Sequence, residues 1–116
     1  MAEESEQLRA AAHERLEGLA DPFLARADVD WGRMFGTIGL RVRRKVFAVA
    51  VQSGGLMVKV PEARADERIA AGEVERMVMA GRSIREWVVA PAEAPDALWV
   101  DLLEEAHAYL DAITPR

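Results

Sequence analysis

The residues that could carry chemistry in this chain are few and widely separated. Its two histidines, His13 and His107, lie in segments near opposite ends that are predicted to be helical. His107 follows Glu104 by three positions, a spacing at which one helix can present two ligands to a metal. No second pair of this kind accompanies it. The absence of cysteine excludes a disulfide framework and thiolate zinc sites.

Nucleophilic and phosphate-binding patterns are equally weak. Ser5, Ser53 and Ser83 lack both a nucleophile elbow and a histidine partner. Gly36 and Gly39 have Gly-x-x-Gly spacing, but a phosphate loop leads into a helix, whereas these flanks predict strand. We therefore expect no catalytic residues, no cofactor and no metal, and we expect that the protein is not an enzyme.

The charges are unevenly distributed along the chain. The segment from Trp31 to Pro61 holds no acidic residue, although the whole chain has a net charge of −5. Its basic residues include a dense cluster: Arg41, Arg43, Arg44 and Lys45. Such a cluster could contact DNA phosphates or another anionic partner, or it could pair with the protein's own acidic helices. Few aromatic residues accompany it, so stacking on single-stranded nucleic acid is poorly supported.

Methionine and tryptophan allow two further interpretations. These side chains could line an adaptable apolar groove, or they could belong to an ordinary core. A face lined by them could also serve a homodimer. The residues concerned are Met34, Met57, Met77, Met79, Trp87 and Trp99.

The N-terminal part of the chain predicts an amphipathic helix. Leucine and alanine recur at helical spacing over roughly Glu3–Leu19. The residue before a proline avoids the helical region, so the helix is expected to stop before Asp21-Pro22. The following segment, Phe23–Asp30, is expected to be a link.

The middle of the chain predicts strands. Met34–Val42 and Val46–Val51 are expected to form a hairpin around a short basic centre, and Leu56–Val60 to form a third strand. Gly36 and Gly39, inside the first run, favour a bulge or a close approach of two backbones.

The remainder predicts a helix, two strands and a final helix. The expected ranges are Glu62–Ala71, Val74–Ala80 and Ile84–Ala90, with the last helix beginning near Pro95. Short links favour antiparallel pairing with helices on one face. We expect one α+β domain over residues 1–116 with a five-stranded antiparallel sheet, in the order α-βββ-α-ββ-α.

Several of these segments together resemble a known family. Over roughly Leu8 to Ile113, the pattern of glycines and apolar residues resembles the TfoX/Sxy N-terminal domain family. The positions that carry the resemblance are Met34, Phe35, Gly36, Gly39, the runs 47–49 and 55–60, Met77 to Gly81, Arg82 and Trp87.

The resemblance implies an α+β fold with an antiparallel sheet. The named members of the family are regulators of bacterial competence that are thought to assist transcription activation by the cyclic-AMP receptor protein. This chain has Thr37 where the family often has a second glycine, and it ends at Arg116 without the C-terminal helical domain of the full-length regulators. The Trp87 region and the final helix more distantly resemble YjbR-like proteins, which are thought to bind DNA.

These observations favour a binding module over an enzyme. We expect a regulatory protein that contacts an unidentified protein partner, with direct DNA binding through the basic hairpin as the alternative. The acidic N-terminus lacks a signal peptide, and no apolar run approaches the ~20 residues of a membrane helix. A cytoplasmic location is therefore expected.

Overall fold

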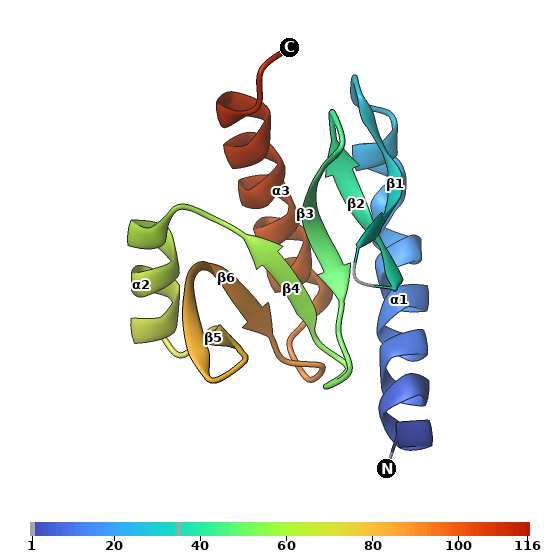
Figure 1. The fold of residues 1–116 in the computed structure, drawn as a ribbon, viewed down its shortest axis with the longest axis vertical. Coiled ribbons are helices and arrows are strands. Elements are labelled where there is room, and N and C mark those ends of the chain that lie inside the picture. The colour runs from blue at the N-terminus through green and yellow to red at the C-terminus, as the bar shows by residue number, and fades with distance from the viewer. Residues whose placement is uncertain (1, 35) are drawn as a thin grey trace.

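The computed structural model describes residues 2–34 and 36–116, which form three helices and a six-stranded antiparallel sheet (Figure 1). The strands lie in the order β1-β2-β3-β4-β6-β5. The predicted α+β class is therefore confirmed. The elements are α1 (Ala2–Leu24), β1 (Val29–Met34), β2 (Thr37–Val42), β3 (Lys45–Ala50), β4 (Leu56–Lys59), α2 (Glu62–Ala70), β5 (Glu75–Met79), β6 (Arg82–Ala90) and α3 (Asp96–Ile113).

The prediction of five strands was wrong, because a further strand, β1, runs from the end of the expected link to Met34, the start of the first predicted strand. This strand pairs with β2 along its whole length, from Val29 opposite Val42 to Met34 opposite Thr37. Gly36, with φ 79°, lies in the turn between them rather than inside a strand. The helix and strand order is accordingly α-ββββ-α-ββ-α. The sequence of β1 is polar at several positions, which hides its strand periodicity.

The prediction that the first helix stops before Asp21 was also wrong. The helix α1 continues through Pro22 to Leu24. Proline removes one backbone hydrogen bond, but Phe23 is 1% exposed and packs in the core. Burial of a phenylalanine side chain contributes about as much free energy as a proline costs in a helix, so packing offsets the local preference.

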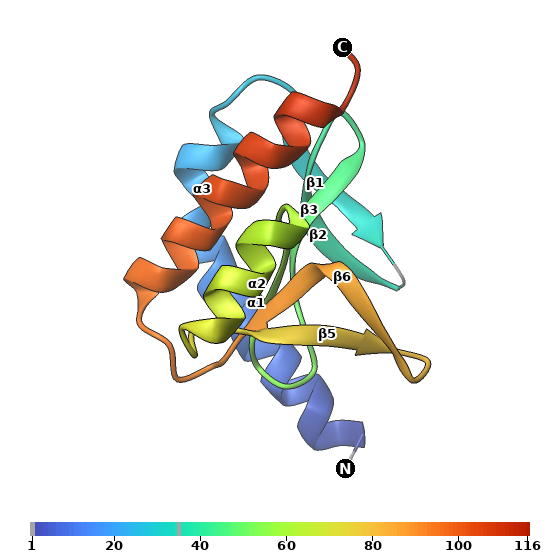
Figure 2. The ribbon, with the colours of Figure 1, turned by 90° about the vertical axis from the view of Figure 1, so that its left-hand side faces the viewer.

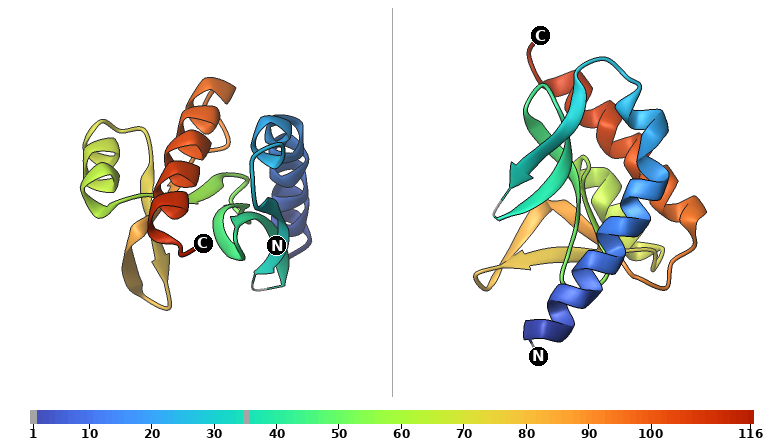
Figure 3. Two further views of the ribbon diagram at one scale, coloured as in Figure 1. Left: turned by 90° about the horizontal axis from the view of Figure 1, so that it is seen from above. Right: turned by 90° about the vertical axis from the view of Figure 1, so that its right-hand side faces the viewer.

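All three helices lie on one side of the sheet (Figures 2 and 3). Side chains from each helix join the same hydrophobic core: Leu16 and Phe23 from α1, Ala65 from α2, and Trp99 from α3. No described helix is long and apolar enough to cross a membrane.

A second apolar row lies on the other face of the sheet. Val49, Met57 and Val89 are directly opposite one another across β3, β4 and β6, so they share that face. Val49 and Met57 are 2% and 4% exposed, although neither belongs to the helix-side core. Something other than a helix must therefore cover them.

The cover comes from two hairpins that project beyond the helix layer on this side. The β1–β2 and β5–β6 hairpins extend in the same direction when the molecule is viewed from above (Figure 3, left). Irregular registers in the β2–β3 and β5–β6 pairs bend the sheet. At Gly39 the expected close approach is confirmed, since a Cβ there would lie 2.7 Å from the carbonyl oxygen of Ala48.

Candidate binding surfaces

Arg43, from the predicted basic cluster, is held by the C-terminal end of α3. Its guanidinium pairs with the carboxylate of Asp111 at 2.9 Å and with that of Asp28 at 3.5 Å. It also donates hydrogen bonds to the backbone oxygens of Asp111, Thr114 and Pro115. The C-terminal carbonyls of a helix lack helical partners, so a cation there both satisfies them and opposes the helix dipole.

The contact changes the acidity of the carboxylate. The hydrogen bond from Arg43 holds the pKa of Asp111 below its ordinary value of 3.8. With only 12% of its side chain exposed, Arg43 is a structural residue and is poorly placed to contact a partner.

Arg41 is also engaged within the molecule. Its guanidinium donates two hydrogen bonds to Asp30 on the neighbouring strand, at 2.6 and 3.1 Å. These hydrogen bonds from Arg41 are the main reason that the pKa of Asp30 lies below its ordinary value of 3.8. The side chain of Arg41 crosses Gly32, where any Cβ would overlap it. The interpretation that the basic segment pairs with the protein's acidic helices therefore holds for Arg43, whereas Arg41 pairs with an acid on strand β1.

Arg44 and Lys45 remain exposed at the tip of the β2–β3 hairpin. Within the described residues, two further cations also lack an ion pair or hydrogen bond: Arg33 on β1 and Arg82 on β6. All cations of the described helices are paired with an acid. The unpaired positive charge is therefore concentrated on the three hairpins.

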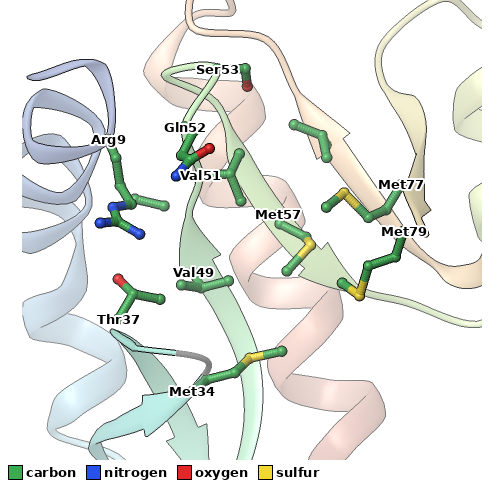
Figure 4. Close-up of a pocket in the computed structure, with 12 residues that line it drawn as sticks. Arg9, Met34, Thr37, Val49, Val51, Gln52, Ser53, Met57, Met77 and Met79 are labelled. Carbon is green, nitrogen blue, oxygen red and sulfur yellow. The ribbon is translucent and has the colours of Figure 1, made fainter. Parts of the chain in front are cut away.

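A largely apolar groove lies on the face of the sheet opposite the helices (Figure 4). Its volume is about 360 Å³, within the range of small ligand pockets. Val49 and Met57 form its floor, and the four predicted methionines all line it. We call this feature the methionine groove; its lining is Arg9, Met34, Thr37, Val49, Ala50, Val51, Gln52, Ser53, Met57, Met77, Met79 and Val89.

The methionines come from different elements and converge. Met34 approaches from β1, Met57 rises from β4, and Met77 and Met79 approach from β5 (Figure 4). Arg9 reaches one side from α1, but its guanidinium is bound to both carboxylate oxygens of Glu6 at 2.5 Å. The groove therefore presents flexible thioethers with few free polar groups.

Trp87 and Trp99, which were considered together with the methionines, do not line the groove. Trp99 is fully buried in the helix-side core, where its indole donates to the carbonyl of Pro91 at 3.3 Å and Arg15 lies over the ring. Trp87 lies opposite Lys59 in the β4–β6 pair and lines a separate shallow depression.

His107 and Glu104 share one partner. The Arg26 guanidinium lies 2.6 Å from the carboxylate of Glu104 and 3.1 Å from Nδ1 of His107. Because a guanidinium only donates, Nδ1 must accept, which requires the neutral ring. Burial, followed by the charge of Arg26, lowers the pKa of His107 below 6.5. His13 lies on α1, and its ring is tilted by 54° against that of Trp31, with the ring centroids 5.1 Å apart.

Three other positions that carry the family resemblance lie in turns or directly after one. Gly36 and Gly81 have φ values of 79° and 77°, which glycine adopts readily, and Arg82 begins β6 directly after the second turn. Phe35 lies outside the described residues.

Sequence reasoning missed Arg9, Thr37, Val49 and Val89 as groove residues. A usable signal was present for Val49. The run from Val46 to Val51 is apolar at every position, a pattern typical of a strand with both faces buried. Arg9 and Thr37 carry no comparable signal, because only the bending of the sheet brings them to the groove.

The family model of the TfoX N-terminal domain matches residues 23–112. No curated protein and no solved structure matches the chain.

Proposed function

Because the chain belongs to the TfoX N-terminal domain family, we propose that it is a non-enzymatic regulatory module that binds a protein partner through the methionine groove. The observation that supports this proposal is the groove itself, an apolar recess on a sheet face that no described helix covers. The family suggests a role of the competence-regulator type.

The chemistry of the lining suits a protein partner. Methionine is unbranched and polarizable, so its side chain adapts to the shape of an apolar segment. Met79, which lines the groove, is 37% exposed, so part of the apolar lining is open to solvent. Apolar patches of this kind commonly mark interaction sites.

The test is a pull-down from native lysate with the Met77→Gln/Met79→Gln variant beside the wild type. Glutamine keeps the size of methionine but makes apolar contact unfavourable, so the variant should lose its partner while remaining folded. Ile113→Gln is the matched control, because Ile113 is 52% exposed at the end of α3 and does not line the groove. Equal capture by wild type and groove variant, or turnover of a metabolite by the pure protein, would contradict the proposal.

Direct DNA binding is a second candidate, favoured by the unpaired cations at the β2–β3 tip. The appropriate variant is Arg44→Glu/Lys45→Glu, since reversal at Arg43 would also remove its contacts to α3. Contacts to phosphate predict a shift of duplex DNA at ~50 mM salt that weakens steeply as salt rises and disappears in the variant. If ~10 μM protein gives no shift at that salt concentration, this candidate is excluded.

A further inference from the structure

Every methionine of the described chain lies in one place. Met34, Met57, Met77 and Met79 all line the methionine groove, and none of them belongs to the hydrophobic core beneath the helices. The chain contains no cysteine, so thioethers are the oxidisable sulfur groups of the described residues. All of this sulfur is therefore located on the face of the proposed partner site and apart from the helix-side core.

The four thioethers differ in their access to solvent. Met79 is 37% exposed, Met34 and Met77 are half-buried, and Met57 is 4% exposed. Met77 and Met79 lie two positions apart on β5, an edge strand of the sheet, and their side chains extend toward Met57 (Figure 4). An oxidant must touch the sulfur atom to react with it. A small neutral peroxide therefore reaches these two thioethers before that of Met57 on the groove floor.

Oxidation of a thioether by a peroxide is a balanced two-electron step. The sulfur lone pair attacks one peroxide oxygen, so that a sulfur–oxygen bond forms and the oxygen–oxygen bond breaks. The proton of the transferred oxygen passes to the departing hydroxide, which leaves as water. The sulfur is oxidised to a sulfoxide and the peroxide is reduced. Sulfoxide reductases reverse the step, with a dithiol as the electron donor and water as the second product.

A sulfoxide would make the apolar groove polar. Its oxygen accepts hydrogen bonds, whereas a partner segment that fits thioethers presents apolar groups. Arg9, the charged side chain of the described lining, is already bound to Glu6. A sulfoxide oxygen covered by the partner would therefore lose its hydrogen bonds to water without replacing them, which weakens binding. The core beneath the helices contains no described methionine, so the same reaction leaves its packing unchanged.

We infer that Met77 and Met79 form a reversible oxidation site, at which a peroxide converts the groove to a form that releases its partner. The sulfur chemistry acts on binding rather than on folding, because the reactive thioethers line the groove and not the helix-side core. This inference rests on the proposed function, and it adds the regulation of that site.

The first test follows the modification itself. The whole chain is treated with increasing hydrogen peroxide, and each methionine is followed by peptide mass mapping. Met79 should be oxidised first, and Met57 about tenfold more slowly, in line with exposed fractions of 37% and 4%. Circular dichroism should remain native once Met77 and Met79 are oxidised. Unfolding at that stage, or oxidation of Met57 before Met79, would overturn the inference.

The second test measures binding in the lysate pull-down, with the immobilised protein freed of peroxide before it meets the lysate. Oxidation of Met77 and Met79 should lower partner capture at least about tenfold. Treatment of the oxidised protein with methionine sulfoxide reductases for both epimers should restore capture. Met77→Leu/Met79→Leu is the matched variant, because leucine conserves volume and apolar character without sulfur. It should capture the partner equally before and after peroxide.

The outcomes distinguish this inference from the function on which it rests. Capture that is lost in Met77→Gln/Met79→Gln but retained after oxidation of both methionines would overturn the inference and leave the proposed function intact. A leucine variant that peroxide affects as strongly as the wild type, or capture that the reductases fail to restore, would also overturn the inference alone. Equal capture by every form, including Met77→Gln/Met79→Gln, would overturn the proposed function and the inference together.

Discussion

Arg43 and Arg44 show how differently two adjacent, chemically identical residues can be used. Both have positive φ, 45° and 73°, in the tight turn between β2 and β3. The side chain of Arg43 folds back onto the end of α3, whereas that of Arg44 remains in solvent. Because the backbone conformations are similar, comparing substitutions at the two positions measures how much the side-chain contacts of Arg43 contribute to the free energy of unfolding.

We expect Arg43→Gln to lower the free energy of unfolding by about 2 kcal/mol, since charged hydrogen bonds and a poorly exposed ion pair are lost together. Arg44→Gln should change it by less than about 0.5 kcal/mol, as is usual at exposed positions. Urea unfolding of both variants beside the wild type measures the difference. Equal effects at the two positions would show that the α3 contacts of Arg43 contribute nothing.

His107 introduces a pH dependence where α3 meets Phe47 of β3 and Arg26, which follows the end of α1. Its ring packs edge-on against Phe47 and accepts from Arg26, while Asp111 and Arg43 also act on it electrostatically. The pKa of His107 is lower in the folded protein than its ordinary value of 6.5. The neutral ring is therefore the form that the fold stabilises.

Because its pKa is lowered in the folded protein, His107 makes the fold more stable at neutral pH than at acidic pH. The contribution of His107 is fully present above pH 6.5 and is lost as pH falls through its folded-state pKa. NMR titration should place the ring below 6.5, and Arg26→Met should raise that pKa by removing a nearby positive charge. A titration at or above 6.5 in the wild type would contradict the buried, neutral state.

At the scale of elements, two-residue turns position the hairpins that form the groove walls. Between β5 and β6 the turn is Ala80-Gly81, with φ values of 52° and 77°. Two consecutive positive φ angles are typical of the type I′ turn, whose twist matches that of paired strands. Alanine is poorly suited to the first position because its Cβ disfavours positive φ.

Ala80→Asn should raise the free energy of unfolding by about 0.5–1 kcal/mol, because Asn-Gly is the preferred type I′ sequence. Gly81→Ala, at the next position, should lower it by at least a similar amount. Thermal unfolding followed by circular dichroism would measure both. A stabilising Gly81→Ala would show that the turn has another conformation in solution.

At the scale of the whole molecule, the sheet has two apolar faces with different surroundings. Leu56 and Met57 are adjacent on β4 and are both nearly inaccessible, at 0% and 4% exposure. Leu56 packs in the core beneath the helices, whereas Met57 forms the floor of an open groove. The same strand therefore contributes alternate residues to stability and to the proposed binding face.

Truncation of each residue should separate these two contributions. Leu56→Ala should cost about 3 kcal/mol of unfolding free energy, within the range for buried leucines. Met57→Ala should cost somewhat less, about 2 kcal/mol, because one side of Met57 borders the groove, but it should impair partner binding. Denaturant unfolding and the lysate pull-down on both variants provide the measurement. A larger stability loss for Met57 would mean that the groove is closed core.

The amino-acid sequence by itself determined the α+β class, the approximate ranges of the second and third helices, and the family. These features depend on local periodicity, capping and turn chemistry, which are written into neighbouring residues. The continuous apolar run of β3 also indicated that both faces of the sheet are buried there, although this was not predicted.

The tertiary structure alone decided the sixth strand, the passage of α1 through Pro22 and the use of each basic or methionine side chain. Polar β1 becomes a strand because β2 pairs with it, and Pro22 stays helical because Phe23 is buried. Arg43 meets Asp111 across 68 residues of sequence, and methionines from β1, β4 and β5 converge only in the bent sheet. Contacts between residues distant in the chain are set by packing, and no local pattern specifies them.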